Sequence, residues 1–281
     1  MNDLSIIIVN TNNKKLLEEC LTSIYQNTRK IALEIIVSDN ASTDGSQSMV
    51  KAKFPQVKLI ENKENLGFIK ASNLGLKAFS ARYAMLLNDD TVVKADALER
   101  LVEFMDKHPE AGACGPKLLN TDGSVQHQGG LFGKRFWLAK EPTAVDFVIG
   151  AALLVRNEVI DRVGIMDENL FFYNDDLDWC LSIRKAGWKI YFVPDAEIIH
   201  YGGYSSKRTF NRRLFVEGFK GGLYFCRKHY GELAYNIYRL CLCFGLSLCL
   251  PFHFFNKEKL SAYSEIIGLA WHGQIPRPML K

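Results

Sequence analysis

The sequence lacks the features of several common protein classes. Its seven cysteines include no C-x-x-C pair, and their number is odd, so neither a disulfide framework nor a thiolate zinc site is supported. Asp3 stands where a signal peptide carries positive charge, and the apolar run Ile6–Val9 is too short for one. The net charge of +4 is too small to indicate nucleic-acid binding. We therefore expect a cytoplasmic protein with reduced thiols.

Glycine-rich phosphate loops are also absent from the start of the chain. The first β-branched run is followed by Asn10–Asn13 rather than by a glycine-rich turn. This argues against a dinucleotide-binding fingerprint and a P-loop, and against the glycine-rich opening of sugar nucleotidyltransferases. With 281 residues, 48% of them hydrophobic, the chain has enough apolar side chains for a large folded core, which excludes disorder as its main state.

Strand and helix patterns alternate through the first two thirds of the chain. The β-branched runs predict strands over Ser5–Val9, Glu34–Ser38, Val57–Ile60, Tyr83–Leu87, Gly112–Leu119, Asp146–Val155 and Lys189–Val193. The helical spacing of apolar residues predicts helices over Lys14–Gln26, Thr43–Phe54, Phe68–Phe79, Asp96–Lys107, Asn157–Val163 and Asp176–Ala186. This alternation predicts an α/β fold with a mostly parallel sheet covered by helices on both faces.

The composition changes after residue 205, which predicts two domains, 1–205 and a helical extension over 206–281. A basic cluster, Lys207, Arg208, Arg212 and Arg213, precedes a mostly apolar region whose densest part is Leu240–Leu250. A spanning helix needs about 20 apolar residues, and this run is shorter than that. The run therefore predicts a helix that lies in a membrane interface, with basic residues facing anionic lipid. A buried helical hairpin, or the surface of a homodimer, is the alternative.

Acidic residues follow two of the predicted strands. Asp39 and Asp44 lie in the loop SDNASTDGS, where they either bind ribose hydroxyls and a base N–H or cap the next helix. Asp89 and Asp90 directly follow the strand Tyr83–Leu87. Adjacent carboxylates repel each other unless a cation offsets their charge, and such oxygen ligands suit Mg²⁺ or Mn²⁺. A solvated turn is the alternative.

A third acidic cluster lies between aromatic residues at the start of a predicted helix. Asp175, Asp176 and Asp178 belong to the segment FFYNDDLDWC. They act as a general base in a partly desolvated pocket, or they simply complement the helix dipole. His200 follows a strand-like stretch and is either structural or a metal ligand beside the acidic residues.

Taken in order, these segments resemble a family-2 glycosyltransferase with the GT-A fold, and most closely the rhamnosyltransferase-like branch that builds bacterial surface polysaccharides. The resemblance covers about residues 3–205. Its motifs are SIIIVNTNN, SDNASTDGS, NLGFIKASNLGL, LLNDDT, GPKLLNTDGSVQ, IGAALLVR and the long run VGIMDENLFFYNDDLDWCLSIRKAGWKIYFVPDAEIIHYGG.

The resemblance implies roles for particular residues. Asp39 matches the aspartate that contacts the nucleotide base, and Asn10, Asp44, Asn65 and Asp89 are expected in the binding site for the nucleotide-sugar donor. The triplet that ends in Asp90 matches the D-x-D position, with asparagine in place of the first aspartate.

The metal and the base are assigned in the same way. Asp90 and His200 are the expected ligands of Mg²⁺ or Mn²⁺. Asp176 is the expected general base, and Asp175 is the other member of an acidic pair. The Q-x-x-R-W signature of processive synthases is absent, which favours the transfer of one sugar per binding event.

The implied reaction is a direct displacement that inverts the anomeric configuration of a dTDP-, UDP- or GDP-linked sugar. The implied acceptor is a glycan, often lipid-linked, at the cytoplasmic face of the inner membrane. A catalytically silent nucleotide-sugar-binding or polysaccharide-binding relative is the main alternative, and a sugar nucleotidyltransferase is the other.

Overall fold

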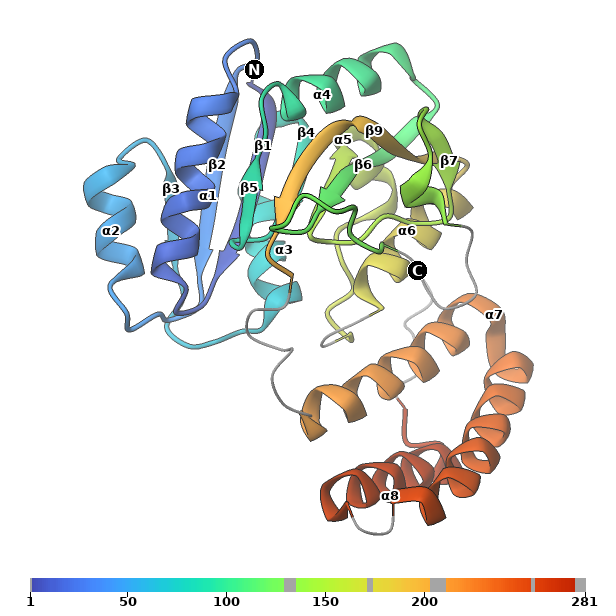
Figure 1. The fold of residues 1–281 in the computed structure, drawn as a ribbon. Coiled ribbons are helices and arrows are strands. Elements are labelled where there is room, and N and C mark those ends of the chain that lie inside the picture. The colour runs from blue at the N-terminus through green and yellow to red at the C-terminus, as the bar shows by residue number, and fades with distance from the viewer. Residues whose placement is uncertain (1, 129–134, 171–173, 203–210, 254–255, 276–281) are drawn as a thin grey trace. The chain divides into compact units, whose positions relative to one another are not determined.

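The computed structural model describes residues 2–128, 135–170, 174–202, 211–253 and 256–275 (Figure 1). Contacts divide the chain into two compact units. The first consists of Met1–Met166 and Asp176–Tyr204, and the second of Asp167–Asp175 and Ser205–Lys281. The predicted boundary at residue 205 did not anticipate that the short segment Asp167–Asp175 groups with the C-terminal helices.

The first unit is a sheet with helices packed against it (Figure 1). Its strands are β1 (Asn2–Asn10), β2 (Leu33–Asp39), β3 (Lys58–Glu61), β4 (Ala81–Leu87), β5 (Thr91–Val93), β6 (Ala111–Leu119), β7 (Thr143–Val145), β8 (Ala152–Arg156) and β9 (Lys189–His200). Its helices are α1 (Lys14–Asn27), α2 (Ser46–Lys53), α3 (Phe68–Ala78), α4 (Ala97–Lys107), α5 (Asn157–Val163) and α6 (Asp175–Lys185), with a 3₁₀ turn, η1 (Phe136–Leu138).

One half of the sheet is parallel, as the sequence predicts. The strand order is β3-β2-β1-β4-β8-β6-β9-β5, and β7 pairs with β9. β1 runs parallel to β2 and β4, and β2 runs parallel to β3. Ile6, Ile7 and Ile8 are buried, since helices cover both faces of such a sheet. The carboxyl ends of these strands therefore meet along one edge.

The other half of the sheet is mixed. β8 runs antiparallel to β4 and β6, whereas β9 runs parallel to β6 and antiparallel to β5 and β7. The predicted strand Asp146–Val155 is wrong at its start, because β8 begins at Ala152. The predicted strand Lys189–Val193 is too short, because β9 continues past Pro194 to His200. A register shift against β6 accommodates this continuation.

Helix α3 packs unusually close to the sheet at one glycine. A Cβ atom built on Gly75 would lie 2.4 Å from Cγ2 of Ile7 in β1. Because no real side chain tolerates such a distance, the glycine allows the helix to contact the strand directly. Separate hydrogen bonds link the loop before α3 to Asn40, which follows β2: Asn40 Nδ2 donates to the carbonyl of Gly67, and the N–H of Leu66 donates to Asn40 Oδ1.

The second unit is helical. It contains α7 (Arg212–Cys249), which is interrupted at Gly231, the 3₁₀ turn η2 (Leu250–His253) and α8 (Lys257–His272). Gly231 has a φ of 83°, in the left-handed region that favours glycine. A small core of Val216, Leu246, Ala262 and Ile266 joins α7 to α8. Among the described residues, we find no helix whose length and apolar character suffice to cross a membrane.

The segment that leads into α6 is fastened to α7 within this second unit. The side chains of Lys228 and Tyr224 donate hydrogen bonds of 2.8 and 2.9 Å to Oδ2 of Asp167. Asn174 donates a 3.0 Å bond to the backbone carbonyl of Gly218. Burial by itself would raise the pKa of Asp167, but the bond from Lys228, helped by bonds from Asn169, outweighs it and lowers the pKa to about 2.

Candidate active site

The ends of β1 and β2 bring Asn10 and Asp39 together, as their paired register requires. Both side chains are buried, and Asn10 Nδ2 donates a 2.7 Å bond to Asp39 Oδ2. The other carboxylate oxygen, Oδ1, accepts bonds from the backbone N–H of Ser42 and from Gln47 Nε2. Oδ1 of Asn10 has no hydrogen-bond partner among the described residues. A buried acceptor without a partner is suited to a ligand that donates a hydrogen bond.

Asp44 and Asn65, two predicted donor-site residues, have local structural roles. Asp44 accepts bonds from the backbone N–H groups of Lys14, at the start of α1, and Ser46, at the start of α2. Asp44 therefore caps two helices. Burial by itself would raise its pKa, but a bond from the Ser46 hydroxyl, together with these backbone bonds, outweighs burial and lowers the pKa. Asn65 is exposed and accepts a 2.9 Å bond from the N–H of Gly67, ahead of α3.

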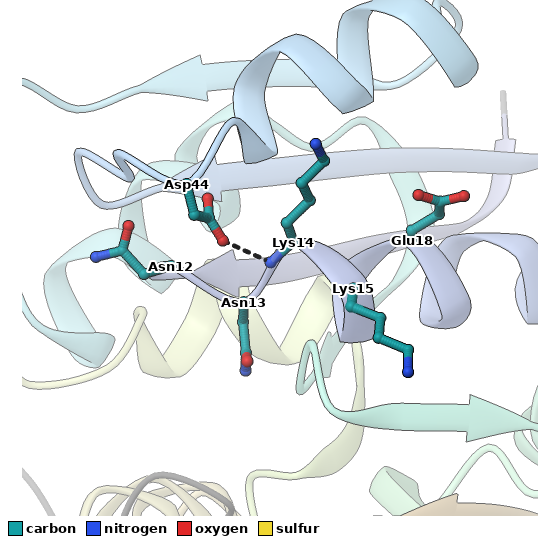
Figure 2. Close-up of a pocket in the computed structure, with 6 residues that line it drawn as sticks. All are labelled: Asn12, Asn13, Lys14, Lys15, Glu18 and Asp44. Atoms are coloured by element: carbon teal, nitrogen blue, oxygen red, sulfur yellow. Dashed lines mark hydrogen bonds between the residues drawn. The ribbon is translucent and has the colours of Figure 1, made fainter.

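A pocket of about 410 Å³ lies at the start of α1, beside this loop (Figure 2). It is lined by Asn12, Asn13, Lys14, Lys15, Glu18 and Asp44. The helix dipole and two lysines favour an anion there, but Glu18 and Asp44 oppose it. Of the predicted site residues only Asp44 lines the pocket, so we centre the candidate site on the strand ends instead.

The pairing of β5 with β9 brings the acidic residues after β4 to His200. Thr91 pairs with His200 in register, so Asp90 Oδ1 lies 3.3 Å from His200 Nε2, and both side chains are buried. Asp89 receives a 3.3 Å bond from Asn13 Nδ2. Burial, followed by repulsion from Asp90, raises the pKa of Asp89 to about 7.

The side chains of Asp90 and His200 fit a divalent cation that the substrate helps to bind. Within the described residues, no cluster of three or more His, Cys, Asp or Glu side chains is placed to hold a metal ion. A carboxylate oxygen and an imidazole nitrogen 3.3 Å apart could supply two ligands to such a cation. Mg²⁺ is commonly held by one or two carboxylates, with substrate phosphates and water completing its shell.

Asp176 is held near the same edge by the chain that enters β8. The N–H of Gly150 donates a 3.2 Å bond to Asp176 Oδ2, and the N–H of Asn88 bonds the carbonyl of Ala151, the next residue. Burial raises the pKa of Asp176, although bonds from the backbone N–H groups of Leu177 and Gly150 oppose the shift. Asp176 is partly buried, and a carboxylate with a raised pKa in such a position is suited to accept a proton.

The neighbours of Asp176 differ in their placement. Asp175 is the first residue of α6, and Asp178 is buried within it. The aromatic residues predicted to flank this cluster on its N-terminal side, 171–173, lie outside the described residues.

Four polar residues of the site received no role from the sequence. Ser42 and Gln47 orient Asp39, Asn13 contacts Asp89, and Gln126 bonds Nδ1 of His200 at 2.7 Å. The only signal for Gln126 was its place at the end of the motif GPKLLNTDGSVQ.

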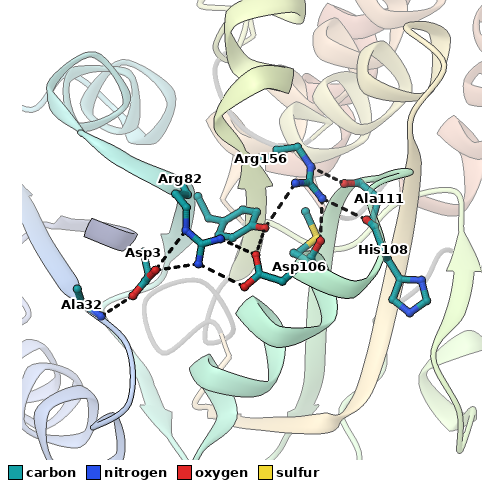
Figure 3. Close-up of polar contacts among 9 residues, drawn as sticks. Asp3, Ala32, Arg82, Asp106, His108, Ala111 and Arg156 are labelled. Atoms are coloured by element: carbon teal, nitrogen blue, oxygen red, sulfur yellow. Dashed lines mark hydrogen bonds and ion pairs between the residues drawn. The ribbon is translucent and has the colours of Figure 1, made fainter. Parts of the chain in front are cut away.

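The opposite, amino-terminal end of the sheet carries a different polar cluster (Figure 3). Arg82, at the start of β4, donates bonds of 2.8 Å to Asp3 and 2.6 Å to Asp106. Arg156, at the end of β8, donates to the carbonyls of Met105, His108 and Ala111. Bonds from Ala32 and Arg82 lower the pKa of Asp3. This cluster is a structural network in which every carboxylate has a cationic partner.

Comparisons with known proteins agree with this geometry. The chain is 29% identical over 227 residues to the N-acetylglucosaminyl-diphospho-decaprenol L-rhamnosyltransferase of Mycobacterium tuberculosis, with 68% of this chain and 74% of the relative covered. It is 26% identical over 176 residues to a dTDP-rhamnosyl transferase of Shigella flexneri, with 59% of each chain covered.

Solved structures show the same fold. The structure of GalNAc-T7 with UDP, GalNAc and Mn²⁺ has a TM-score of 0.66 at 17% identity, covering 97% of this chain and 56% of that one. A mannosyltransferase from Pyrobaculum calidifontis, in complex with GDP-Man and Mn²⁺, has a TM-score of 0.61 at 17% identity, covering 95% and 86%. The predicted GT-A fold is confirmed.

The family model described as Glycosyl transferase family 2 matches residues 5–164, which hold Asn10, Asp39 and Asp90. The chain is therefore an enzyme of sugar transfer and belongs to glycosyltransferase family 2.

Proposed function

We propose that this enzyme transfers one sugar, with inversion, from a nucleotide-sugar to a hydroxyl group of a lipid-linked glycan. The observation that carries the proposal is the partly buried carboxylate of Asp176, held by Gly150 beside the sheet edge where Asp90 and His200 meet. A base and a two-ligand cation site at one strand edge are what a direct displacement needs, and no separate nucleophile is required.

Each group has a defined task in this reaction. Asp39 and Asn10 bind the nucleotide, using the carboxylate and the unpartnered Oδ1 of Asn10. Asp90 and His200 hold the divalent cation, which when bound offsets the charge of the leaving diphosphate. Asp176 takes the proton from the acceptor hydroxyl as its oxygen attacks the face of the sugar opposite the leaving group. The new glycosidic bond forms as the bond to the diphosphate breaks.

The relatives' names support a substrate class. One relative is named for transfer of L-rhamnose to N-acetylglucosaminyl-diphospho-decaprenol, and another for transfer from a dTDP-linked donor. We therefore assign a dTDP-deoxysugar as donor and a sugar linked through diphosphate to a polyprenol as acceptor. Such an acceptor presents its hydroxyl at a membrane surface.

A donor screen tests the function. Purified enzyme is incubated with dTDP-, UDP- and GDP-sugars, a lipid-linked acceptor and either Mn²⁺ or Mg²⁺, and release of the nucleoside diphosphate is measured. We expect release to require the cation and to be greatest with the dTDP-sugar. Full activity in excess EDTA would contradict the roles of Asp90 and His200. No turnover of any donor would favour a silent binding relative, and release of pyrophosphate would favour a nucleotidyltransferase.

The second unit provides a surface for membrane attachment. Leu233, Ile237, Leu240, Phe244 and Leu248 are all more than half exposed. Their spacing of four, three, four and four residues places them in one stripe along α7, on the side away from the buried Tyr235, Cys243 and Leu246. An apolar stripe of this length on a helix is suited to lie in the headgroup region of a bilayer.

The basic cluster predicted to assist this attachment is partly used elsewhere. Arg212 forms an ion pair with Glu265 of α8, and Lys207 and Arg208 lie outside the described residues. We therefore assign most of the membrane affinity to the apolar stripe rather than to charge.

Membrane sedimentation tests the attachment. Glutamate at both Phe244 and Leu248 should move the enzyme from membranes to the supernatant and reduce transfer to lipid-linked acceptor, while hydrolysis of the donor continues. Leu138→Glu is the matched control, because Leu138 is 57% exposed in the first unit and should leave sedimentation unchanged. A wild-type protein that remains in the supernatant as a dimer without detergent would contradict membrane attachment and identify the stripe as a dimer surface.

A further inference from the structure

His200 lies at one end of a series of hydrogen bonds that starts at the turn after β6. The turn is closed by backbone bonds from Asn120 to Ser124 and from Gln126 to Leu118. Four side-chain bonds then follow one another. They are Ser124 Oγ to Asp122 Oδ1 at 2.6 Å, Asn120 Nδ2 to Ser124 Oγ at 2.9 Å, Gln126 Nε2 to Asn120 Oδ1 at 3.1 Å and the contact of His200 Nδ1 with Gln126 Oε1 at 2.7 Å.

The donor and the acceptor of each hydrogen bond in this series can be assigned by starting at Asp122, its exposed end. The bond from Ser124 lowers the pKa of Asp122, so its carboxylate is ionised at neutral pH and can only accept. Ser124 gives its one hydroxyl proton to Asp122 and must accept from the amide nitrogen of Asn120. The carbonyl oxygen of Asn120 consequently faces the amide nitrogen of Gln126. The second N–H of Gln126 donates to the backbone carbonyl of His200 at 3.2 Å.

The buried end of the series therefore has only one arrangement. Both N–H groups of Gln126 have acceptors, so its Oε1 is the atom that faces the imidazole of His200. An amide oxygen can only accept, so Nδ1 of His200 carries the proton. In a neutral imidazole, Nε2 then carries the lone pair. Asn88 Nδ2, which can donate to it, and Asp90 Oδ1 each lie 3.3 Å from Nε2.

We propose that Gln126 is a positioning residue that holds His200 in the tautomer protonated at Nδ1, so that Nε2 and Asp90 together face a divalent cation. Gln126 and His200 are both buried, so water does not readily replace this bond. The role of the cation rests on the proposed function, whereas the tautomer follows from the hydrogen bonds alone. Outer partners of this kind orient metal-bound histidines in many proteins.

The tautomer is tested first, in the metal-free protein. Long-range ¹H–¹⁵N NMR spectra of protein labelled at its six histidines distinguish a protonated ring nitrogen from a bare one, and His200→Gln assigns the signal. We expect His200 to be protonated at Nδ1 in the wild type and to lose this preference in Gln126→Leu. A wild-type His200 protonated at Nε2, or a Gln126→Leu variant that stays folded with the same tautomer, would overturn the proposal.

Cation binding is tested second, without reference to activity. Free Mn²⁺ measured by electron paramagnetic resonance should show a 10–100-fold weaker affinity in Gln126→Leu, the usual effect of losing an outer partner. Gln126→Glu keeps an acceptor at the same position and should remain within a few-fold of wild type. Ser124→Ala, which breaks only the outer bonds, is the control and should change the affinity least.

The two readouts separate this inference from the proposed function. Equal loss of Mn²⁺ affinity in Gln126→Leu and Gln126→Glu, with an unchanged tautomer, would show that Gln126 is merely structural and would overturn the proposal. A wild-type protein with the Nδ1 tautomer, set by Gln126, that binds no Mn²⁺ even with nucleoside diphosphate would contradict the cation's role and still support the hold of Gln126 on His200.

Discussion

The two ends of the central sheet differ in whether their carboxylates pair with arginine. At the amino-terminal end, Asp3 and Asp106 both pair with the guanidinium of Arg82, and the pKa of each carboxylate is lowered. At the carboxyl-terminal end, neither Asp89 nor Asp176 has a Lys or Arg ion pair from the described part of the chain, and the pKa of each is raised. The same kind of side chain is paired with arginine at one end, and at the other it has a raised pKa, which is common at functional sites.

This difference indicates where the chain gains stability and where it gives stability up. A carboxylate paired with arginine favours folding at neutral pH, whereas adjacent carboxylates with no cationic partner oppose it. Substitutions at the two ends should therefore affect stability and activity in opposite proportions.

The largest effect is expected at Asp176. Asp176→Asn should lower the rate of sugar transfer by ~10²–10⁴-fold, the usual effect of losing a general base, and should leave donor affinity and melting temperature nearly unchanged. Steady-state kinetics and isothermal titration with the donor measure this. Asp175→Asn is the matched control, and if it is the inactive variant instead, the base has been assigned one position too late.

The raised pKa of Asp176 also predicts the acid side of the pH profile. The base must be deprotonated to act, so the rate should fall as pH drops through a pKa that burial has moved above the ordinary value of 3.8. A profile that falls only at the pH of an exposed aspartate would contradict this.

The second-largest effect is expected at Arg156, where a substitution should lower stability and leave catalysis unchanged. Arg156→Met leaves the carbonyls of Met105, His108 and Ala111 without their donor, which should lower the free energy of unfolding by about 2–3 kcal/mol. Urea titration measures this, and Mn²⁺ affinity should not change. Arg156→Lys should recover part of the stability, because lysine restores the charge but cannot donate to all three carbonyls.

A smaller effect is expected in the helical unit, at a carboxylate paired with lysine. Lys228→Met should lower the stability of this unit by about 1–2 kcal/mol at neutral pH, because it removes the cation that lowers the pKa of Asp167 to about 2. A depressed pKa stabilises the fold above the unfolded value and loses its contribution as pH falls toward 2. Thermal melts of the variant and wild type should therefore differ at pH 7 and coincide near pH 2.

The smallest effect is expected at Asp89, where a substitution should raise stability rather than lower it. Asp89→Asn removes a charge that lies beside Asp90 and has no cationic partner among the described residues. The free energy of unfolding of the metal-free protein should therefore stay the same or rise by up to about 1 kcal/mol, and the melting temperature should not fall. Asp106→Asn is the comparison and should be destabilising, because it removes partners of Arg82 and Tyr83. If both variants lower the melting temperature equally, the contrast between the two ends of the sheet is wrong.

The sequence predicted the strands and helices of the parallel half well, because β-branched runs such as Ser5–Val9 and helical spacing are local signals. It could not predict β5, whose three residues are too short for a periodic pattern. Yet the pairing of β5 with β9 is what brings Asp90 to His200. Asp44 shows a different limit of sequence-based prediction. A carboxylate in a loop after a strand gives the same sequence pattern whether it binds a nucleotide or caps a helix. The contacts of Asp44 with Lys14 and Ser46 in the structure show the capping.

Side-chain contacts between distant positions were likewise invisible in the sequence. Gln126 and His200 are separated by 74 residues, and Asp167 and Lys228 by 61. No local pattern marks such a pair, because each partner is an ordinary polar residue within its own segment.

The route of the chain between the two units limits where the enzyme can be cut to remove or exchange one unit. The backbone passes from one unit to the other after Met166, again between Asp175 and Asp176, and a third time after Tyr204. A cut at residue 205 would remove Lys228 and Tyr224, and the segment that leads into α6 would lose the hydrogen bonds that they donate to Asp167. Chimeras that exchange the C-terminal helices should therefore move residues 167–175 with them, because these two stretches of sequence form one compact unit.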